Sequence, residues 1–254
     1  MRLIACSHTG KIGDALYSLP TIRALCDRHR AKSDFYTTPD CKPMSSLMEY
    51  QSCINRVIIT PDFVNETCLS DNSKPWRVEF PSLPVKDYEA VYDLSFHSFP
   101  DCPLPEFIAK QAGFDYPMGS QFSIETVNIH EQIGPYYVLA PGKRLGFENL
   151  FNEIVQKSPF PVLIVGAKGE MIDHGDDRTG MTILRMASAI SKAKGFIGLL
   201  SSPLVVAQAF DIPKVVIFDG VCWDPRHQLR NKWTDYLVNP SAEWVLKTLE
   251  RKRI

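Results

Sequence analysis

The sequence predicts an α/β protein built from two halves, each containing a parallel sheet. Short apolar segments alternate with helical ones, the alternation restarts near residue 134, and 254 residues suffice for two small domains. Strands that alternate with helices pair in parallel through crossover connections, which is the pattern of a Rossmann-like domain. The expected strands of the first half are 3–6, 34–37, 56–60 and 90–94.

Between these strands, the first half is expected to hold helices and one long loop. Apolar residues recur at helical spacing in 15–29, 44–50 and 105–111. The segment 61–84 is instead rich in Pro, Asp, Asn and Ser and lacks periodicity, which is typical of a long loop.

The second half repeats the pattern of the first. The expected strands are 136–140, 162–165, 196–199 and 214–218, and the expected helices are 147–156, 183–192, 204–210 and 242–251. A polar segment followed by Gly134-Pro135 marks the boundary, so we predict an N-terminal domain over 1–133 and a C-terminal domain over 134–254. Because ligands bind beyond the carboxyl ends of parallel strands, a cleft between the two domains is the expected site.

The composition is that of a folded globular protein without a strongly charged surface. Hydrophobic residues make up 44% of the chain, and the formal net charge is −1, which gives no basic field for nucleic acid or an anionic membrane. No apolar run approaches the roughly 20 residues that span a bilayer. Nucleic acid is therefore not indicated as a partner, and stable membrane insertion is not expected.

Cysteine usage predicts a reducing compartment. The seven cysteines are odd in number and form no C-x-x-C pair, and no signal peptide precedes them. This pattern argues against a secreted disulfide framework and a zinc knuckle, so we expect a cytoplasmic protein. The Asp- and Gly-rich stretch 173–177 could hold a metal ion, but it is also typical of an ordinary polar turn, and we predict no metal site.

The start of the chain carries the main candidate for chemistry. An apolar strand is followed by a turn with Gly10 and Gly13, and then by Asp14 near the start of a helix. Free N–H groups at a helix start favour an ionised carboxylate, which can serve as a general base for a hydroxyl. Asp is also a preferred N-cap residue, so a purely structural role for Asp14 is the alternative.

Two familiar nucleotide-binding loops are excluded at this turn. A phosphate-binding P-loop needs G-x-x-x-x-G-K-[ST], but Gly10-Lys11 is followed by Ile12 and has no glycine at the required upstream position. The dinucleotide fingerprint G-x-G-x-x-G fails because only Gly10 and Gly13 match its last two glycines. We therefore expect no redox cofactor.

Loops that follow strands of the second half are the candidates for binding phosphate. Ser201 or Ser202 can cap the helix that begins near Pro203, and several free N–H groups at that helix start can bind a diphosphate. Lys143 and Arg144, directly after an expected strand, could neutralise it. The alternatives are an ordinary Ser cap followed by Pro and a pair of solvated basic residues.

One long motif resembles a known family. Residues 13–25 match G-D-x-x-x-x-L-P-x-x-R-x-L, which resembles the signature of the heptosyltransferase-like family nine glycosyltransferases, proteins with the GT-B fold. Further segments that are similar to this family are 88–94, 137–142, 179–184 and 193–218. The resemblance thus covers most of the chain.

The resemblance implies a GT-B-like protein that moves a sugar from a nucleoside diphosphate sugar to a hydroxyl acceptor, with inversion and without a required metal. It implies that Asp14 is the catalytic base and that Ser201 and Ser202 contact the diphosphate. The expected partners are a nucleotide-sugar donor and a hydroxyl-bearing acceptor such as a glycan.

Two departures from the family pattern support an alternative function. Leu200 stands where the family has Asp, and Val205 stands where it has His, so two polar groups are missing from the donor side. The alternative is a catalytically inactive module that binds a nucleotide or a sugar. Transfer or hydrolysis of a donor distinguishes the two, since a binding module yields no product.

Other polar residues are weaker candidates. His8, Gly13 and His97 are expected at the same edge of the first sheet, where they could contact the acceptor, although an isolated loop histidine is more often hydrogen-bonded or solvated. The segment 223–226 follows the last strong strand and contains Trp and Arg, which could stack on a base and meet a phosphate. Burial of Trp223 in the core is the alternative.

Overall fold

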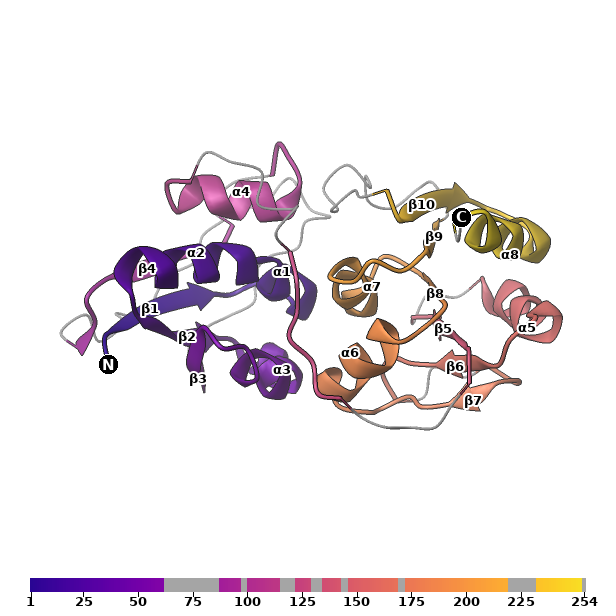
Figure 1. Ribbon diagram of the computed structural model, residues 1–254, viewed down its shortest axis with the longest axis horizontal. Helices are drawn as coiled ribbons and strands as arrows, with labels where there is room; N and C mark the ends of the chain where they lie inside the picture. The colour runs from indigo at the N-terminus through magenta and orange to yellow at the C-terminus, as the bar shows by residue number, and fades with distance from the viewer. Residues whose placement is uncertain are drawn as a thin grey trace. The chain divides into compact units, whose positions relative to one another are not determined.

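The computed structural model describes residues 1–61, 87–96, 100–114, 122–128, 134–142, 146–168, 172–218 and 232–252. The described residues form two compact units, one ending at Glu125 and the other beginning at Thr126, and each unit contains one sheet (Figure 1). The domain boundary after residue 133 stays a prediction, because 129–133 lie outside the described residues. Most of the loop predicted at 61–84 also lies outside them.

The first unit contains a four-stranded parallel sheet with the strand order β3-β2-β1-β4. Its strands are β1 (Leu3–His8), β2 (Lys32–Thr37), β3 (Ile54–Ile59) and β4 (Val91–Asp93). All four predicted strands are confirmed, with small shifts at their ends. Because Ser7 is in register with Asp93, the carboxyl ends of β1 and β4 lie side by side.

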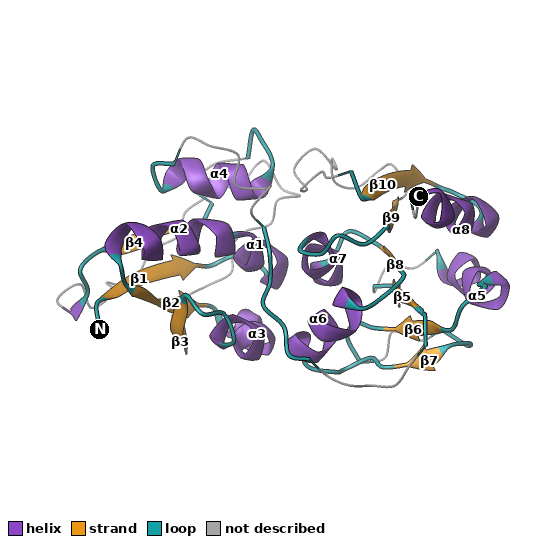
Figure 2. Ribbon diagram, in the orientation of Figure 1, coloured by secondary structure: helices purple, strands orange, loops and turns teal. Residues whose placement is uncertain are grey.

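The helices of the first unit are α1 (Ile12–Tyr17), α2 (Leu19–His29), the 3₁₀ helix η1 (Pro39–Met44), α3 (Ser45–Glu49) and α4 (Leu104–Gln111). The helix predicted over 15–29 is thus two helices that meet at Ser18. The backbone N–H and the hydroxyl of Ser18 both donate to the carbonyl of Ala15, at 3.2 and 2.6 Å, and Pro20 has no N–H to continue the ladder. In Figure 2, α2 lies over the sheet and α4 packs against α1 and α2.

The second unit contains a six-stranded parallel sheet with the order β10-β9-β8-β5-β6-β7. Its strands are β5 (Tyr137–Ala140), β6 (Val162–Ile164), β7 (Asp176–Asp177), β8 (Gly195–Gly198), β9 (Lys214–Phe218) and β10 (Thr234–Val238). The four predicted strands of this half are confirmed as β5, β6, β8 and β9. The inner strands β5 and β8 are buried along their whole length, as expected for a parallel sheet covered on both faces.

The helices of the second unit are α5 (Glu148–Lys157), α6 (Ile183–Ser191), α7 (Ser202–Gln208) and α8 (Ala242–Arg251), and all four confirm predicted helices. Each amphipathic helix buries one face. Val245 and Leu249 of α8 join Phe151 and Ile154 of α5 in one core cluster with the inner strands. The hydroxyl of Ser241 caps α8 by accepting the backbone N–H of Trp244 at 3.2 Å.

Two edge strands, β7 and β10, are not among the predicted strands. β7 consists of the exposed residues Asp176 and Asp177, and in β10 Leu237 is the one buried residue. Neither strand carries the apolar run that marks a buried strand. Both are held by ladder hydrogen bonds to the neighbouring strands β6 and β9, which only the assembled sheet supplies.

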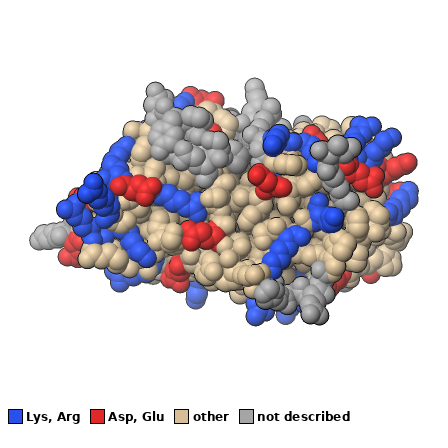
Figure 3. Space-filling model, viewed as in Figure 1, with Lys and Arg blue, Asp and Glu red and all other residues tan. Residues whose placement is uncertain are grey.

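The surface carries charges of both signs. On the face drawn in Figure 3, Lys and Arg are interspersed with Asp and Glu. No helix within the described ranges is long and apolar enough to cross a membrane. The five cysteines that belong to the described residues (Cys6, Cys26, Cys41, Cys53 and Cys102) are free thiols.

Candidate active site

The turn after β1 is held in place by the two neighbouring strands. The backbone N–H of Thr9 donates to the hydroxyl of Ser95 at 3.0 Å, and the N–H of Ser95 donates to Oδ1 of Asp93 at 3.0 Å. On the other side of β1, the hydroxyl of Thr37 donates to the carbonyl of His8 at 2.9 Å. These bonds fix the backbone of the turn from both flanks, so the side chains it carries are preorganised.

Gly10 is required at this turn for steric reasons. Its backbone N–H donates to Nδ1 of His8 at 2.9 Å, which brings the imidazole against the glycine. A Cβ atom at residue 10 would lie 2.6 Å from Cε1 of His8 and 3.0 Å from Cβ of Asp14. The thiol of Cys41 donates to the carbonyl of Gly10 at 3.1 Å. The turn thus tolerates no side chain at this position without a shift of its neighbours.

His8 is the buried last residue of β1. Its ring packs edge-on against Phe96 with ring centroids 5.1 Å apart, and Nδ1 accepts the Gly10 N–H. The hydrogen-bonded alternative weighed for His8 therefore describes its contacts in this structure. His97, the second histidine expected at this edge, lies outside the described residues.

Asp14 is the third residue of α1, and its carboxylate takes part in the structure of the helix start. Its Oδ2 accepts the backbone N–H of Lys11 at 3.2 Å, so the carboxylate caps the helix start. Burial of the carboxylate raises the pKa of Asp14 to about 6, although the Lys11 N–H and the Lys11 charge act in the opposite direction. A carboxylate with this pKa is ionised at neutral pH and able to take up a proton. The adjacent Gly13 is partly buried beside it.

Ser201 and Ser202, which are predicted to contact a diphosphate, lie at the start of α7. Ser201 is the N-cap, but its hydroxyl donates to the carbonyl of Leu199 at 3.3 Å instead of capping the helix. The N–H groups of Leu204 and Val205 both donate to the carbonyl of Ser201, at 3.0 and 3.3 Å, and proline at 203 has none. Within the described part of the chain, the N–H groups of Ser201 and Ser202 donate no hydrogen bond, so fewer N–H groups are free at this helix start than the sequence suggests.

The carboxyl ends of β5 and β8 lie together beside this helix start. Ala140 is in register with Gly198, and Gly142, with φ of +68°, sits where a Cβ would lie 3.4 Å from Cδ1 of Leu199. The loop that follows β5 therefore starts next to the segment that leads into α7. Lys143 and Arg144 belong to this loop, but they lie outside the described residues, as does 223–226.

The two residues that depart from the family pattern have apolar side chains, and both are at least partly buried. Leu200 is partly buried, and Val205 is 4% exposed inside α7. Neither side chain offers a hydrogen bond to a nucleotide. The polar groups that the described residues offer at this helix start are backbone groups and serine hydroxyls.

The stretch 173–177 forms a turn and the edge strand β7. Nε of Arg178 pairs with Oδ1 of Asp176 at 2.9 Å, and Oδ1 of Asp177 accepts the N–H of Thr179 at 2.9 Å. The carboxylates of Asp176 and Asp177 therefore already have partners in the same segment. Across the described residues, no group of three or more His, Cys, Asp or Glu side chains is arranged to hold a metal ion.

Comparison with solved structures identifies the fold. No protein-family model and no curated protein sequence matches the chain. The E. coli heptosyltransferase WaaC, in a structure with ADP-2-deoxy-2-fluoro heptose, is 16% identical and matches 98% of this chain and 99% of its own with a TM-score of 0.66. A family 9 glycosyltransferase of Veillonella parvula is 11% identical, with 99% and 97% covered and a TM-score of 0.70. The chain has the GT-B fold.

The GT-B fold confirms the resemblance that the sequence predicts. TibC, an iron-containing dodecameric glycosyltransferase of enterotoxigenic E. coli, shares it at 17% identity and a TM-score of 0.62, over 94% of this chain and 64% of its own. At these identities, the comparison establishes the fold alone. The cleft expected between the two halves stays a prediction.

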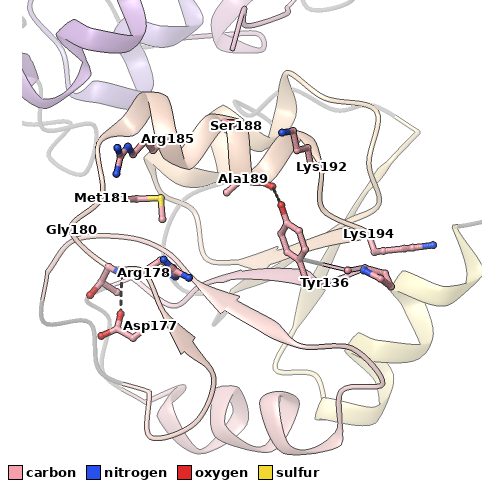
Figure 4. Close-up of a pocket in the computed structure, with 13 residues that line it drawn as sticks. Tyr136, Asp177, Arg178, Gly180, Met181, Arg185, Ser188, Ala189, Lys192 and Lys194 are labelled. Carbon is pink, nitrogen blue, oxygen red and sulfur yellow. Dashed lines mark hydrogen bonds between the residues drawn. The ribbon is translucent and has the colours of Figure 1, made fainter. Parts of the chain in front are cut away.

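This GT-B chain also contains a cavity that the sequence does not reveal. It has a volume of about 740 Å³ and lies along α6, lined by residues from the four stretches 134–136, 177–181, 185–192 and 194 (Figure 4). None of the predicted site residues lines it. Its residues are scattered over a turn, a helix and two strand starts, and although some of them belong to the family-like segments 179–184 and 193–218, no single motif brings them together.

Proposed function

We propose that this GT-B chain is an inverting glycosyltransferase that moves a sugar from a nucleoside diphosphate sugar to a hydroxyl acceptor. The observation that carries the proposal is the Asp14 carboxylate, whose pKa is raised to about 6 by burial at the carboxyl edge of a parallel sheet. The structural similarity to WaaC with an ADP-sugar analogue supports the same reaction class.

In the proposed reaction, Asp14 removes the proton from the acceptor hydroxyl as the hydroxyl oxygen attacks the anomeric carbon. The new C–O bond forms on the face opposite the diphosphate, and the bond to the diphosphate breaks with its electron pair leaving on the diphosphate oxygen. This single displacement inverts the anomeric centre. The proton ends on Asp14, whose raised pKa makes it a better proton acceptor than an exposed aspartate.

The leaving diphosphate is proposed to bind at the start of α7. The N–H groups of Ser201 and Ser202 and the Ser202 hydroxyl can donate to phosphate oxygens there, and Lys143 and Arg144 supply positive charge from the loop after β5. Stabilising the departing charge lowers the barrier to breaking the glycosidic bond. Neither a metal nor a cofactor is part of this scheme.

The acceptor is proposed to be a hydroxyl-bearing glycan in the cytoplasm. It would approach the turn at Gly10 and Gly13, where Asp14 can reach its proton. The rival function is a binding module without turnover, which the loss of polar groups at Leu200 and Val205 favours.

A donor screen followed by a product assay tests the proposal. Thermal shifts against a panel of nucleoside diphosphate sugars identify the donor, because a ligand at 100 times its Kd stabilises by about 2.7 kcal/mol. The donor found in this way is then incubated with the protein and a panel of glycan acceptors, and release of nucleoside diphosphate is measured. Release that requires an acceptor supports a transferase, whereas donor binding without release favours the binding module.

A further inference from the structure

Two cysteines of the first unit meet at the turn that precedes β3. Cys26 belongs to α2, and Cys53 lies directly before Ile54, the first residue of β3. The thiol of Cys26 donates to the carbonyl of Cys53 at 3.4 Å and is also hydrogen-bonded to the Cys53 side chain. Two sulfur atoms that are 27 residues apart in the sequence therefore face each other in the reduced protein.

The two thiols differ in their exposure to solvent. Cys26 is 4% exposed, whereas Cys53 is partly exposed. A third cysteine near Cys53 is Cys6 of β1, and it is fully buried. A dissolved oxidant therefore reaches Cys53 before it reaches either of the other two thiols.

The surroundings of Cys53 favour its thiolate. The hydrogen bond from Cys26 lowers the pKa of Cys53. The Arg23 guanidinium acts in the same direction, whereas burial and the Glu125 carboxylate act against it. Arg23 is held near the pair, because its guanidinium also donates to Oε1 of Gln51 at 2.9 Å. A partly exposed thiol beside a guanidinium is the usual setting of a reactive cysteine.

The other cysteines among the described residues lack this setting. Cys102 is also partly exposed, but burial and a hydrogen bond to Asp101 raise its pKa. Burial raises the pKa of Cys6 to about 12, and the buried Cys41 donates its thiol proton to the carbonyl of Gly10 at 3.1 Å. Because the thiolate is the nucleophile, Cys53 is expected to react before these three.

We propose that Cys53 and Cys26 are a peroxide-sensitive pair, in which Cys53 is oxidised to a sulfenic acid and Cys26 then forms a disulfide with it. In the first step, the Cys53 sulfur attacks one oxygen of hydrogen peroxide and the O–O bond breaks. The second oxygen leaves with the electron pair and takes up the proton that the thiol released, which gives water.

In the second step, the Cys26 sulfur attacks the Cys53 sulfur and the S–O bond breaks. The departing hydroxide takes up the Cys26 proton and becomes a second water molecule. Two thiols have then lost two electrons and two protons, and one hydrogen peroxide has been reduced to two waters. Contact between the two side chains in the reduced protein favours this step over further oxidation of Cys53.

The proposed disulfide adjoins the contact that holds the segment 122–125 on the first unit. Ser52, next to Cys53, donates its backbone N–H and its hydroxyl to the Glu125 carboxylate at 3.1 and 2.7 Å. The bond would therefore join α2 to the turn that binds Glu125. A reversible disulfide is compatible with the reducing compartment that the sequence predicts, where such bonds are usually transient or redox-sensing.

Peptide mapping of the full chain tests this proposal. The reduced protein is freed of reductant, treated with hydrogen peroxide and blocked with N-ethylmaleimide. Trypsin and a glutamate-specific protease then release Cys26 in peptide 24–28 and Cys53 in peptide 50–56. We expect mass spectrometry to find these peptides linked, two hydrogens lighter than their sum, and dithiothreitol to separate them. The link should form at least about tenfold faster than Cys102 loses its free thiol.

Two variants separate the roles of the two cysteines. Cys26→Ser should stop the reaction at the sulfenic acid, so that dimedone labels Cys53 and no link forms. Cys102→Ser is the matched control, because it removes another partly exposed thiol, and it should change the yield of the link less than about twofold.

Three results would overturn the proposal. The first is a wild-type chain in which Cys53 stays reduced, or stays a sulfenic acid, without a link to Cys26. The second is a link from Cys53 to another cysteine, such as Cys6. The third is loss of the Cys102 thiol as fast as the link forms, which would assign reactivity to exposure alone. Melting curves followed by circular dichroism check the folding of the variants, and the wild-type peptide map decides the question if Cys26→Ser does not fold.

Discussion

The backbone N–H of Lys11 donates to Oδ2 of Asp14 across 3.2 Å, so one carboxylate both caps α1 and faces the turn at Gly10. A cap normally stabilises the ionised carboxylate and lowers its pKa. Here burial outweighs that effect, and the pKa of Asp14 is raised to about 6. The carboxylate is thus held in one orientation without losing its basicity, which is what a general base needs.

Replacing Asp14 by Asn is expected to abolish sugar transfer while leaving donor binding nearly intact. The amide cannot accept the acceptor proton, but its oxygen can still accept the Lys11 N–H. Loss of a general base typically costs roughly a hundredfold to ten-thousandfold in rate. The rate is measured by single-turnover transfer, with Asp27→Asn on the exposed face of α2 as the control. A variant with more than about a third of the wild-type rate would show that Asp14 is not the base.

The pH dependence of transfer should follow the ionisation of Asp14. Because the ionised form is the active one, kcat/KM is expected to fall about tenfold for each pH unit below about 6.

The stability of the protein should depend on the same ionisation. Since the pKa of Asp14 in the folded state lies above the usual value of 3.8, the folded state binds the proton more tightly than the unfolded chain does. The contribution of Asp14 to the free energy of unfolding therefore falls as pH rises from 3.8 to about 6. Paired pH profiles of rate and of urea unfolding for wild type and Asp14→Asn measure both effects. A rate that stays constant down to pH 4.5 would contradict the assignment.

Gly10→Ala is expected to destabilise the first unit and to reduce transfer. The added methyl would lie 2.6 Å from Cε1 of His8, so the imidazole or the turn must move. Overpacking of this kind typically costs about 1–3 kcal/mol. Gly134→Ala is the matched control, because no atom lies within 4 Å of its added methyl and the cost should stay under about 0.5 kcal/mol. Equal unfolding free energies for the two variants would show that the turn adjusts freely.

Changes at the start of α7 and in the loop after β5 are expected to act on nucleotide binding. Lys143→Ala with Arg144→Ala should weaken binding of the donor nucleotide, and the loss should shrink as salt is added. Ser202→Leu should block binding, because the larger side chain would occupy the space beside the free N–H groups. Calorimetric titration with the nucleoside diphosphate measures both. Unchanged affinity in both variants, or a soaked crystal with the nucleotide at the Gly10 turn, would refute the donor assignment.

Lys214 should make the stability of the second unit depend on pH. Its side chain is fully buried at the start of β9 and donates to the carbonyls of Phe210 and Ile212 at 2.6 and 2.7 Å. Burial lowers the pKa of Lys214 to about 7, so between pH 7 and 10.5 the unfolded chain binds more protons than the folded one. The free energy of unfolding should therefore rise with pH over this window, relative to Lys214→Met.

The measurement for Lys214 is urea unfolding between pH 7 and 9.5, where the difference between wild type and variant should grow with pH. Lys32→Met changes an exposed lysine in the same way and should leave the pH dependence unchanged. A constant difference between wild type and Lys214→Met across this range would show that the buried ammonium keeps an ordinary pKa.

Candidate residues that lie close together in the sequence could be predicted before the structure was known. Gly10 and Asp14 belong to one strand–turn–helix unit, so their proximity follows from chain connectivity. What the sequence could not show is the raised pKa of Asp14, because it results from burial by the surrounding fold. Similarly, the serines at the start of α7 were identified from local pattern, but the structure shows that the Ser201 hydroxyl donates to the carbonyl of Leu199.

By itself, the sequence determined most of the helices and the strands other than β7 and β10, because apolar periodicity and turn residues act over a few neighbouring positions. It did not determine the edge strands β7 and β10, which depend on ladder partners distant in the chain. The cavity along α6 was also decided only by tertiary structure. Residues from β7, from α6 and from the segment before β8 line one cavity only in the assembled unit, and packing of that kind depends on the whole core rather than on local sequence.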